Sequence, residues 1–162
     1  PGSGPAPVAE RHAVSAEAQP GFEARVRDSF SRQQAMATIG ARLLRVAAGE
    51  VDIELPHRDD LTQQHGFLHA GIVGAVLDSA CGYAAYSLMP PDAAVLSIEY
   101  KVNLLAPAKG ERVIARARVK KAGRTIIVCD ADAFAVTGQE EKLVASMTGT
   151  MMCVTGRPEL LG

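Results

Sequence analysis

Aromatic residues are scarce in this sequence: tryptophan is absent, and aromatic side chains make up only 4% of the 162 residues. Recognition of nucleic acid by base stacking is therefore not expected. Neither sign of charge is in excess, because 17 basic and 18 acidic residues give a formal net charge of −1 at pH 7. Without a basic excess, the composition predicts no nucleic-acid partner.

Cysteine is also rare, and its number is odd. Cys81, Cys129 and Cys153 each lie inside a predicted helix or strand, and none has a histidine at a spacing that suggests a catalytic pair. Buried, reduced thiols of this kind are typical of cytoplasmic proteins rather than of secreted, disulfide-bonded ones. We therefore expect a cytoplasmic location and no catalytic cysteine.

No targeting or membrane segment is evident. Residues 1–20 are rich in proline, alanine, glycine and charge and lack an apolar core, which predicts a disordered N-terminal tail and no signal peptide. Residues 72–89 could be read as a membrane span, but their length is marginal and Asp78 would lie near the middle of the bilayer. We expect no membrane association.

Hydrophobic residues make up 48% of the chain, enough for the core of one globular domain, which we place at residues 21–155, followed by a tail at 156–162. Residues 69–88, HAGIVGAVLDSACGYAAYSL, are apolar on nearly every side and predict a long buried helix. Asp78 lies in the middle of that helix. A carboxylate there is costly unless it is paired or used, which makes Asp78 the first candidate functional residue.

Hydrophobic periodicity predicts the elements around this helix. They are an amphipathic helix at residues 21–40, a hairpin with arms 41–46 and 50–55, a long polar loop at 57–68, and four strands at 94–105, 112–122, 125–137 and 143–154. The short turns make neighbouring strands antiparallel. The sequence therefore predicts an α+β fold, in which a curved antiparallel sheet wraps one long central helix and an extra amphipathic helix lies at the N-terminus.

Small residues are expected to let this helix approach the sheet closely. One face of the strand at 125–137 carries Cys129, Ala131, Ala133 and Ala135. The helix supplies small residues as well, namely Gly74, Ala75, Ala80, Gly82, Ala84 and Ala85. These matching faces predict dense packing of the helix on the sheet, with little room for larger side chains.

Three short motifs, in a fixed order, resemble a known enzyme family. They are Gln-Gln-His-Gly-Phe-Leu-His-Ala-Gly at residues 63–71 followed by Asp78, Val-Leu-Ser-Ile-Glu at 95–99, and Ala-Pro-Ala-Lys-Gly at 106–110. Together with the predicted elements, they make residues 41–152 similar to the PaaI-type acyl-CoA thioesterases of the 4-hydroxybenzoyl-CoA thioesterase superfamily. The resemblance implies the hotdog fold and the hydrolysis of acyl-CoA.

Two positions depart from the family pattern. The family often has asparagine where Gln63 stands, and it usually has His-Gly-Gly where this chain has His69-Ala70-Gly71. Gln63 still supplies an amide, one methylene further out, and Ala70 keeps its backbone N–H. The departures therefore bear on substrate fit and rate rather than on the type of reaction.

Hydrolysis of a thioester needs a group that polarises the carbonyl and a carboxylate or base that acts on water or on the carbonyl carbon. The first N–H groups of a helix have no intrahelical partner and carry the positive end of its dipole, so the Ala70 N–H is suited to polarise the carbonyl oxygen. Asp78 would orient or deprotonate water, or attack directly. By the resemblance, Ser97 would lie beside Asp78 and help to hold the water. The side chain of His69 could orient the loop and Gln63.

His69 and Asp78 cannot serve one thioester from the same chain. Nine residues of helix separate them by roughly 13.5 Å and place them on opposite faces. A two-fold dimer, in which the helix start of one chain faces Asp78 of the other, would complete two equivalent sites. The resemblance implies the same arrangement, and we expect a homodimer that pairs further into a dimer of dimers, a tetramer.

Simpler roles are also open for these residues. Asp78 could be a structural acid bonded to a neighbouring strand, His69 could only cap the helix, and Ser97 could be an ordinary strand residue. His65 and His69, four residues apart and close to an acidic loop segment, have a spacing compatible with a metal site, but this spacing is common by chance. We expect no metal and no bound cofactor, since coenzyme A is part of the substrate.

Basic residues recur on one face of the strand at 112–122, as on a track for nucleotide phosphates. Asp130 and Asp132 of the next strand would lie opposite two of them, so ion pairs across the strands are expected there. The basic residues at the following turn lack an obvious acidic partner and are better candidates for the phosphates of coenzyme A. The predicted substrate-binding residues are Lys120, Lys121, Arg124 and Thr125 at this turn, with His65 and Gly71 near the helix start.

The first hypothesis is a cytoplasmic thioesterase that cleaves acyl-CoA to a free carboxylic acid and coenzyme A, with a tunnel for the acyl group along the small residues of the helix. One alternative is a hotdog hydratase or dehydratase, although the position of the acid matches the thioesterase pattern. Another alternative is a non-catalytic acyl-CoA binder or sensor, in which Asp78 would have no catalytic use.

Overall fold

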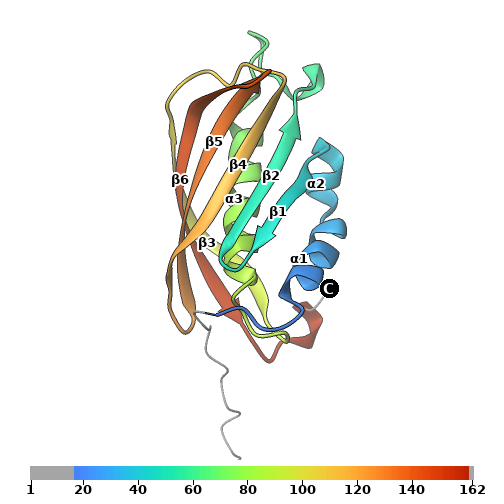
Figure 1. Ribbon diagram of the computed structural model, residues 1–162, viewed down its shortest axis with the longest axis vertical. Coiled ribbons are helices and arrows are strands. Elements are labelled where there is room, and N and C mark those ends of the chain that lie inside the picture. The colour runs from blue at the N-terminus through green and yellow to red at the C-terminus, as the bar shows by residue number, and fades with distance from the viewer. Residues whose placement is uncertain (1–16, 161–162) are drawn as a thin grey trace, which may run out of the picture.

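The computed structural model describes residues 17–160, so residues 1–16 of the predicted tail lie outside the described residues. The helices are α1 (Phe22–Ser31), α2 (Gln34–Ile39) and α3 (Ala70–Tyr86), with short 3-10 turns at Asp59–Leu61 and Pro158–Leu160 (Figure 1). The strands are β1 (Arg42–Ala47), β2 (Glu50–Pro56), β3 (Ala94–Leu104), β4 (Arg112–Ala122), β5 (Ile126–Thr137) and β6 (Glu140–Val154). The segment predicted as a C-terminal tail thus contains one of the 3-10 turns.

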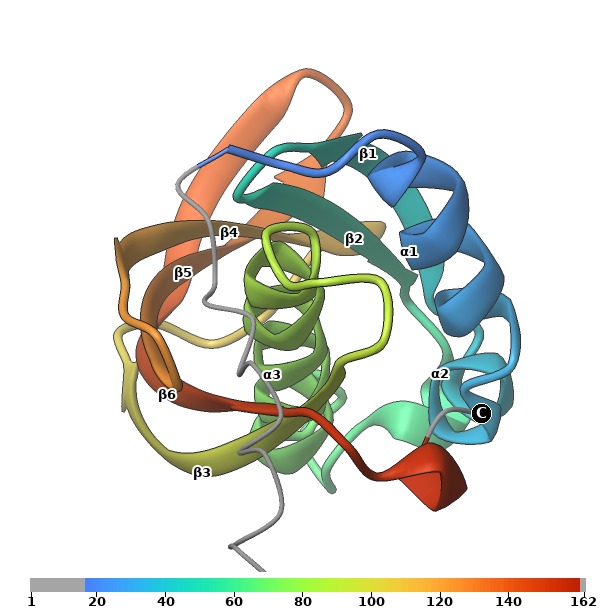
Figure 2. The ribbon, with the colours of Figure 1, turned by 90° about the horizontal axis from the view of Figure 1, so that it is seen from below.

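The six strands form one antiparallel sheet in the order β1-β2-β4-β5-β6-β3, with β1 and β3 at its edges. Figure 2 looks along α3 and shows the sheet curving around this helix, while α1 and α2 lie along the opening between the two edges. One long helix enclosed by a curved antiparallel sheet is the hotdog fold. The predicted fold class is therefore confirmed.

The long helix α3 is buried because its apolar residues face the sheet on several sides. Val76, Leu77 and Ala80 have no exposed surface at all. The helix begins and ends within two residues of the predicted bounds. Among the helices of residues 17–160, none is both long enough and apolar enough to cross a membrane.

The helix α3 packs closely against Gly149 on β6. A Cβ atom there would lie 2.9 Å from Cε of Met151 and 3.4 Å from Cβ of Cys81, so only glycine fits without a shift of its neighbours. In contrast, a Cβ atom on Gly74 or Gly82 would meet nothing within 4 Å. The prediction that these two helix glycines allow close packing is therefore wrong, because they face open space rather than the sheet.

The expected small face of β5 does pack under the helix. Cys129, Ala131, Ala133 and Ala135 are all at most 4% exposed, whereas the residues between them are half-buried on the outer face. Alternation of this kind follows from the two-residue period of a strand. The prediction of a small inner face on β5 is confirmed.

The three cysteines are free and buried. A hydrogen bond with Cys129 and burial both raise the pKa of the Cys81 thiol. Burial also raises the pKa of Cys153. Since the thiolate is the nucleophilic form of cysteine, a raised pKa suppresses the reactivity of both side chains. These thiols pack in the core, as expected.

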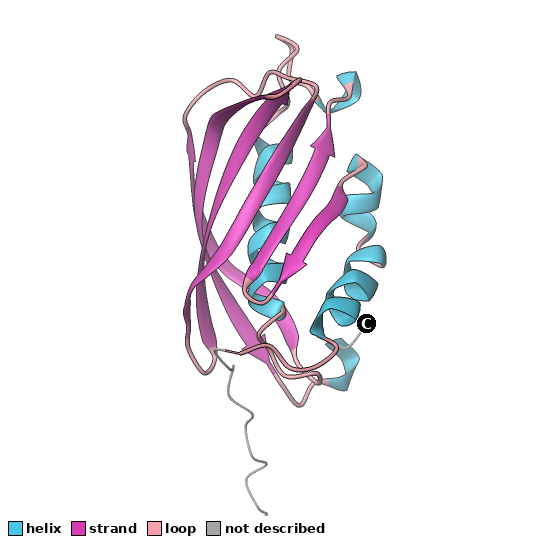
Figure 3. Cartoon of the chain, in the orientation of Figure 1, coloured by secondary structure: helices cyan, strands magenta, loops and turns pink. Residues whose placement is uncertain are grey.

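The N-terminal helix is divided in two, whereas the sequence predicted one helix at residues 21–40 (Figure 3). The break falls at Arg32 and Gln33, where Gln33 has an extended backbone with φ −77° and ψ 95°. The bend brings the Gln33 side chain to α3, where it accepts a hydrogen bond from Ser79 at 3.4 Å. The end of α2 at Gly40, with a left-handed φ of 76°, agrees with the prediction.

Candidate functional site

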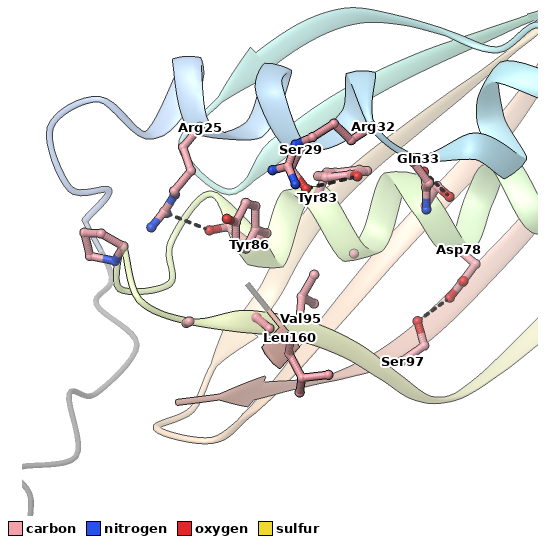
Figure 4. A pocket seen from close by; sticks show the side chains of 15 residues that line it. Arg25, Ser29, Arg32, Gln33, Asp78, Tyr83, Tyr86, Val95, Ser97 and Leu160 are labelled. Atoms are coloured by element: carbon pink, nitrogen blue, oxygen red, sulfur yellow. Dashed lines mark hydrogen bonds between the residues drawn. The ribbon is translucent and has the colours of Figure 1, made fainter. Parts of the chain in front are cut away.

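Asp78 lies in the middle of α3 and is half-buried, so its carboxylate reaches the surface of a pocket. The hydroxyl of Ser97 on β3 donates a hydrogen bond to Oδ1 of Asp78 at 2.8 Å, and it also lies 3.4 Å from Sδ of Met151 (Figure 4). The edge strand therefore brings Ser97 beside Asp78, where the resemblance located it.

The second carboxylate oxygen of Asp78 is free to act on a ligand. No hydrogen bond within residues 17–160 uses Oδ2 of this side chain. Asp78 therefore has one oxygen fixed by a strand residue and the other exposed to the pocket.

The pocket at Asp78 has a volume of about 520 Å³. Its walls come from α1, α3 and the beginning of β3, and Leu160 of the C-terminal turn closes one side (Figure 4). Arg25 and Ser29 come from α1, and Arg32 and Gln33 come from the break that follows it. These four positions were not identified from the sequence as part of a site. Arg25, Ser29 and Gln33, spaced four residues apart, form a polar stripe beside the apolar stripe of this helical segment.

The other end of α3 begins with a cap made by His69. Its Nδ1 accepts a hydrogen bond from the Gly71 N–H at 2.9 Å, and its carbonyl accepts from the N–H groups of Ile72 and Val73. The role of His69 as a helix cap, left open in the sequence, is therefore present in the structure. The Gly71 N–H is occupied by this contact, so the substrate-binding role predicted for Gly71 cannot use that donor.

The cap leaves one backbone donor at the helix start without a partner. Among the described residues, nothing accepts a hydrogen bond from the Ala70 N–H, whereas the N–H groups of the next three residues are all bonded. Unbonded N–H groups at a helix N-terminus bind negatively charged or polarised oxygen atoms. The Ala70 N–H is thus an unbonded hydrogen-bond donor, as the predicted chemistry requires.

The polar loop before α3 is a tight turn rather than a loose segment. The Gln63 N–H donates to the Phe67 carbonyl at 2.9 Å, and the Gly66 N–H donates to the Gln63 carbonyl at 3.0 Å. The side-chain oxygen of Gln63 accepts from the backbone N–H of His65. This leaves the amide NH₂ of Gln63 as the group that can donate to a ligand, while the His65 side chain is exposed at the tip.

A second pocket, of about 480 Å³, lies at the helix start. Gln63, Ala70 and Val73 form one side of it, and the end of β3, with Leu104 and Leu105, forms another. None of its lining residues is shared with the pocket at Asp78. Ala70 and Asp78 are separated by eight residues, or roughly 12 Å along the helix axis. Within one chain, the two predicted halves of the site stay apart.

The ion pairs on the outer face of the sheet differ in part from the prediction. Arg116 is registered with Asp132, as expected, but it forms a two-point ion pair with Glu141 at 2.7 Å. This pairing lowers the pKa of Glu141. Lys120 lies 3.2 Å from Asp130, so the premise that Lys120 lacks an acidic partner is wrong. A one-residue bulge near Val119 shifts the strand and brings Lys120 over that acid.

The turn between β4 and β5 lies at the Asp78 end of the sheet. Its Thr125 carbonyl accepts from the Cys153 N–H at 2.8 Å, and Cys153 is registered with Val95, two residues before Ser97. Lys121 and Arg124 are exposed, and neither forms an ion pair within the part of the chain that the structure describes. These two cations are thus unpaired among the described residues, whereas Lys120 is engaged by its own ion pair.

His65 and His69 are the two histidines whose spacing is compatible with a metal site. Across residues 17–160, histidine, cysteine and acidic side chains do not gather in any group of three or more that could hold a metal ion. Nδ1 of His69 is already engaged with the Gly71 N–H, and Nε2 of His65 lies 3.5 Å from the Gln64 amide nitrogen. The donors that a metal site at the two histidines would need do not converge.

Comparison with known proteins identifies relatives of this arrangement. A family model described as the thioesterase superfamily matches residues 65–142. A thioesterase family protein of Silicibacter pomeroyi is 56% identical, with a TM-score of 0.82, and the match covers 84% of this chain and 100% of that one.

More distant relatives agree with this result. A Halobacterium salinarum protein with a provisional esterase name is 31% identical over 100 residues, which cover 59% of this chain and 66% of that protein, so the match spans just under two thirds of its length. The PaaI protein of Escherichia coli, from the phenylacetic acid degradation operon, is 18% identical, with a TM-score of 0.77 over 86% of this chain and 98% of that one. At that identity the likeness concerns the fold alone.

Proposed function

Because this chain belongs to the thioesterase superfamily, we propose that it hydrolyses acyl-CoA thioesters to a free carboxylic acid and coenzyme A. The observation that carries the proposal is the carboxylate of Asp78, which is fixed at one oxygen by Ser97 and open at the other to a pocket of about 520 Å³. A carboxylate held in this way can act on water or on a carbonyl carbon. The proposed reaction uses no metal and no bound cofactor.

In the proposed reaction, the thioester carbonyl oxygen accepts a hydrogen bond from the Ala70 N–H, which stabilises the negative charge that develops on that oxygen. Asp78 removes a proton from water as the water attacks the carbonyl carbon, or attacks that carbon itself and is released by water in a second step. The bond between carbon and sulfur breaks, and coenzyme A leaves as its thiol. Ser97 keeps the carboxylate oriented, and the Gln63 amide donates to the substrate near Ala70.

The proposal includes a dimer, because Ala70 and Asp78 lie in different pockets of one chain. The edge strand β3 supports it, since large apolar side chains on an open sheet edge are normally covered. Those of β3 are Leu96 (47% exposed), Ile98 (50%), Tyr100 (50%) and Leu104 (57%). A second copy of β3 is the self-complementary partner for such an edge.

The register proposed for this dimer follows from the positions of the two pockets along β3. Ser97 lies at the Asp78 pocket, and Leu104 lies at the Ala70 pocket. If two copies of β3 pair in antiparallel fashion about a two-fold axis between Tyr100 and Lys101, Ser97 of each copy lies opposite position 104 of the other. The Asp78 pocket of one chain then adjoins the Ala70 pocket of its partner. Pairing of two such dimers into a tetramer stays a prediction.

We also propose that Lys121 and Arg124 bind phosphate groups of coenzyme A. Both are exposed cations at the Asp78 end of the sheet, and Thr125 between β4 and β5 adds a hydroxyl donor. The cytoplasmic location, where coenzyme A esters are available, stays a prediction based on three free cysteines.

The proposal is tested with a panel of alkyl- and aryl-CoA thioesters, by following release of the free thiol from the wild type and from Asp78→Asn. We expect hydrolysis of at least one ester and a loss of at least about 1,000-fold in kcat for the variant, because the carboxylate acts directly in the reaction. Binding of several esters without hydrolysis would instead identify an acyl-CoA-binding protein. Equal turnover by Asp78→Asn would remove Asp78 from the mechanism.

A further inference from the structure

One wall of the Asp78 pocket consists of polar contacts that α3 makes with α1 and with the break after it, and α1 and α3 run antiparallel. The contacts are Ser79 to Gln33 (3.4 Å between Oγ and Oε1), Ser29 to Tyr83 (3.4 Å between the hydroxyl oxygens), and Arg25 to Tyr86 (3.1 Å from Nη2 to the backbone oxygen) (Figure 4). All six residues line the pocket. We refer to this wall as the polar ladder.

The polar ladder leads away from the reacting centre. Its first contact lies beside Asp78, since Ser79 is the next residue of α3. Tyr83 follows roughly 7.5 Å further along the helix axis from Asp78, and Tyr86 roughly 12 Å. Gly82, on the same side of α3, leaves the space in front of the ladder open, because a Cβ there would meet nothing within 4 Å. An acyl group bound at Asp78 would therefore extend along these contacts.

Arg25, at the far end of the ladder, has hydrogen-bonding capacity that the protein does not use. Its Nη2 donates to the carbonyls of Tyr86 and Met89 at 3.1 and 2.7 Å, and the guanidinium lies 4.6 Å from the Tyr86 ring centre. Nε and Nη1 are buried and have no hydrogen-bond partner. Unbonded N–H groups are costly where they are buried, and a small shift of the half-buried Arg25 side chain towards an acceptor on a ligand would relieve that cost.

The charges around the pocket are separated by position. Asp78 is the only acidic residue in its lining and lies at the reacting end, whereas Arg25 lies at the opposite end. Arg25 forms no ion pair within residues 17–160. The second cation of the lining, Arg32, is already paired with Asp28 at 3.0 Å. An acyl group that carries a negative charge at its far end would complement this distribution.

We propose that this pocket selects acyl groups that carry a hydrogen-bond acceptor, a carboxylate above all, at the end remote from the thioester. Arg25 is the residue that binds this acceptor. The inference rests on the proposed thioester hydrolysis and names its substrate class. Of the roughly 12 Å between Asp78 and Tyr86, a hydrogen bond takes about 3 Å. The remaining 9 Å or so corresponds to an extended chain of about eight carbons, because each C–C bond of ~1.5 Å advances a zigzag chain by only about 1.3 Å.

The test compares kcat/KM for suberyl-CoA, 8-hydroxyoctanoyl-CoA and octanoyl-CoA, which have the same length and differ only at the far end. We expect the wild type to prefer suberyl-CoA over octanoyl-CoA by at least about tenfold, the factor typical of a charge-assisted hydrogen bond, with the hydroxy ester between them. Succinyl-CoA should have no such advantage over butanoyl-CoA, because its carboxylate would lie beside Asp78.

Arg25→Met should abolish the preference while octanoyl-CoA is still hydrolysed, and Arg25→Lys should restore part of it. Arg27→Met is the matched control, since Arg27 lies on the same helix, is exposed and pairs with Glu23. The ratio of kcat/KM for two esters, measured in one variant, does not change if part of that protein is unfolded. The ratio for the wild type can be measured without any substitution. A wild type that hydrolyses octanoyl-CoA as well as suberyl-CoA would overturn the inference alone. Failure to hydrolyse any ester of either panel would overturn the proposed function.

Discussion

The Ser97 hydroxyl donates a hydrogen bond to Oδ1 of Asp78 at 2.8 Å, and this contact joins the buried helix α3 to the edge strand β3. A change in the pairing of β3 would therefore alter the position of the Asp78 carboxylate. If the edge strand is also the dimer contact, the same serine links assembly to the orientation of the proposed catalytic group.

Ser97→Ala should lower kcat by roughly tenfold to a hundredfold, because a hydrogen bond to a charged group is worth ~1.5–3 kcal/mol. Free-thiol release gives the rate. Thr150→Ala is the matched control, as it removes a hydroxyl that donates to Glu99 at 3.2 Å elsewhere on the same pair of strands. Equal rates for the two variants would show that the Ser97 contact does not support the reaction.

Ala70→Pro should reduce kcat by about 100-fold or more without unfolding the protein. Proline removes the N–H proposed to polarise the thioester, and it is well tolerated at the first position of a helix. Ala70→Gly keeps the N–H and should keep most of the activity. Thermal unfolding checks that the proline variant is folded, and full activity in that variant would exclude the backbone donor from the mechanism.

Gly82 and Gly149 should respond oppositely to substitution by alanine. Gly149→Ala places a methyl 2.9 Å from Cε of Met151, so the end of this buried side chain has to shift and we expect a loss of ~1 kcal/mol in the free energy of unfolding. Gly82→Ala meets open space and should be neutral or stabilising by up to ~1 kcal/mol, while it narrows the pocket beside Asp78. Chemical denaturation measures both, and similar losses would contradict the difference in packing.

Asp52 and Glu141 both interact with Arg116 but should have opposite effects on stability. Burial raises the pKa of Asp52 above its ordinary value, so its contribution is most favourable at low pH and is lost as the pH rises through the folded pKa. Arg116 lowers the pKa of Glu141, so its contribution is present at neutral pH and is lost as the pH falls through the folded pKa.

At pH 7, Asp52→Asn should therefore raise the Tm and Glu141→Gln should lower it, and both differences should shrink as the pH approaches 3. Added salt should weaken the Glu141 effect in particular, because that ion pair is exposed. Melting curves at pH 7 and pH 3 provide the measurement. Shifts of the same sign in both variants at pH 7 would contradict the assigned pKa directions.

Sequence periodicity predicted those features that depend on local pattern. The bounds of β4 and the burial of α3 follow from the alternation and the apolar character of their own residues, and the family resemblance supplied the approach of Ser97 to Asp78. The break at Gln33 depends on a contact with Ser79 that lies 46 residues away, which no local pattern contains.

Other features depend on small displacements within the sheet. The bulge beside Val119 turns Lys120 towards Asp130, and strict alternation along the strand would not predict it. The orientation of Gly82 towards a pocket instead of the sheet depends on how α3 is rotated about its axis. Composition shows that the helix has small residues but not which of them border open space. The position of α1 at the pocket wall likewise depends on tertiary packing, and the sequence did not predict it.

The central claim is that one reaction uses Ala70 of one chain and Asp78 of another. It is tested most directly by dissociating and remixing Asp78→Asn with Ala70→Pro, each of which should be inactive alone. In random hybrids, half of the dimers are mixed and each contains one intact site, so the account predicts recovery of roughly a quarter of wild-type activity. Mixed dimers that form, as shown by mass spectrometry of differently tagged chains, but recover no activity would contradict the shared site.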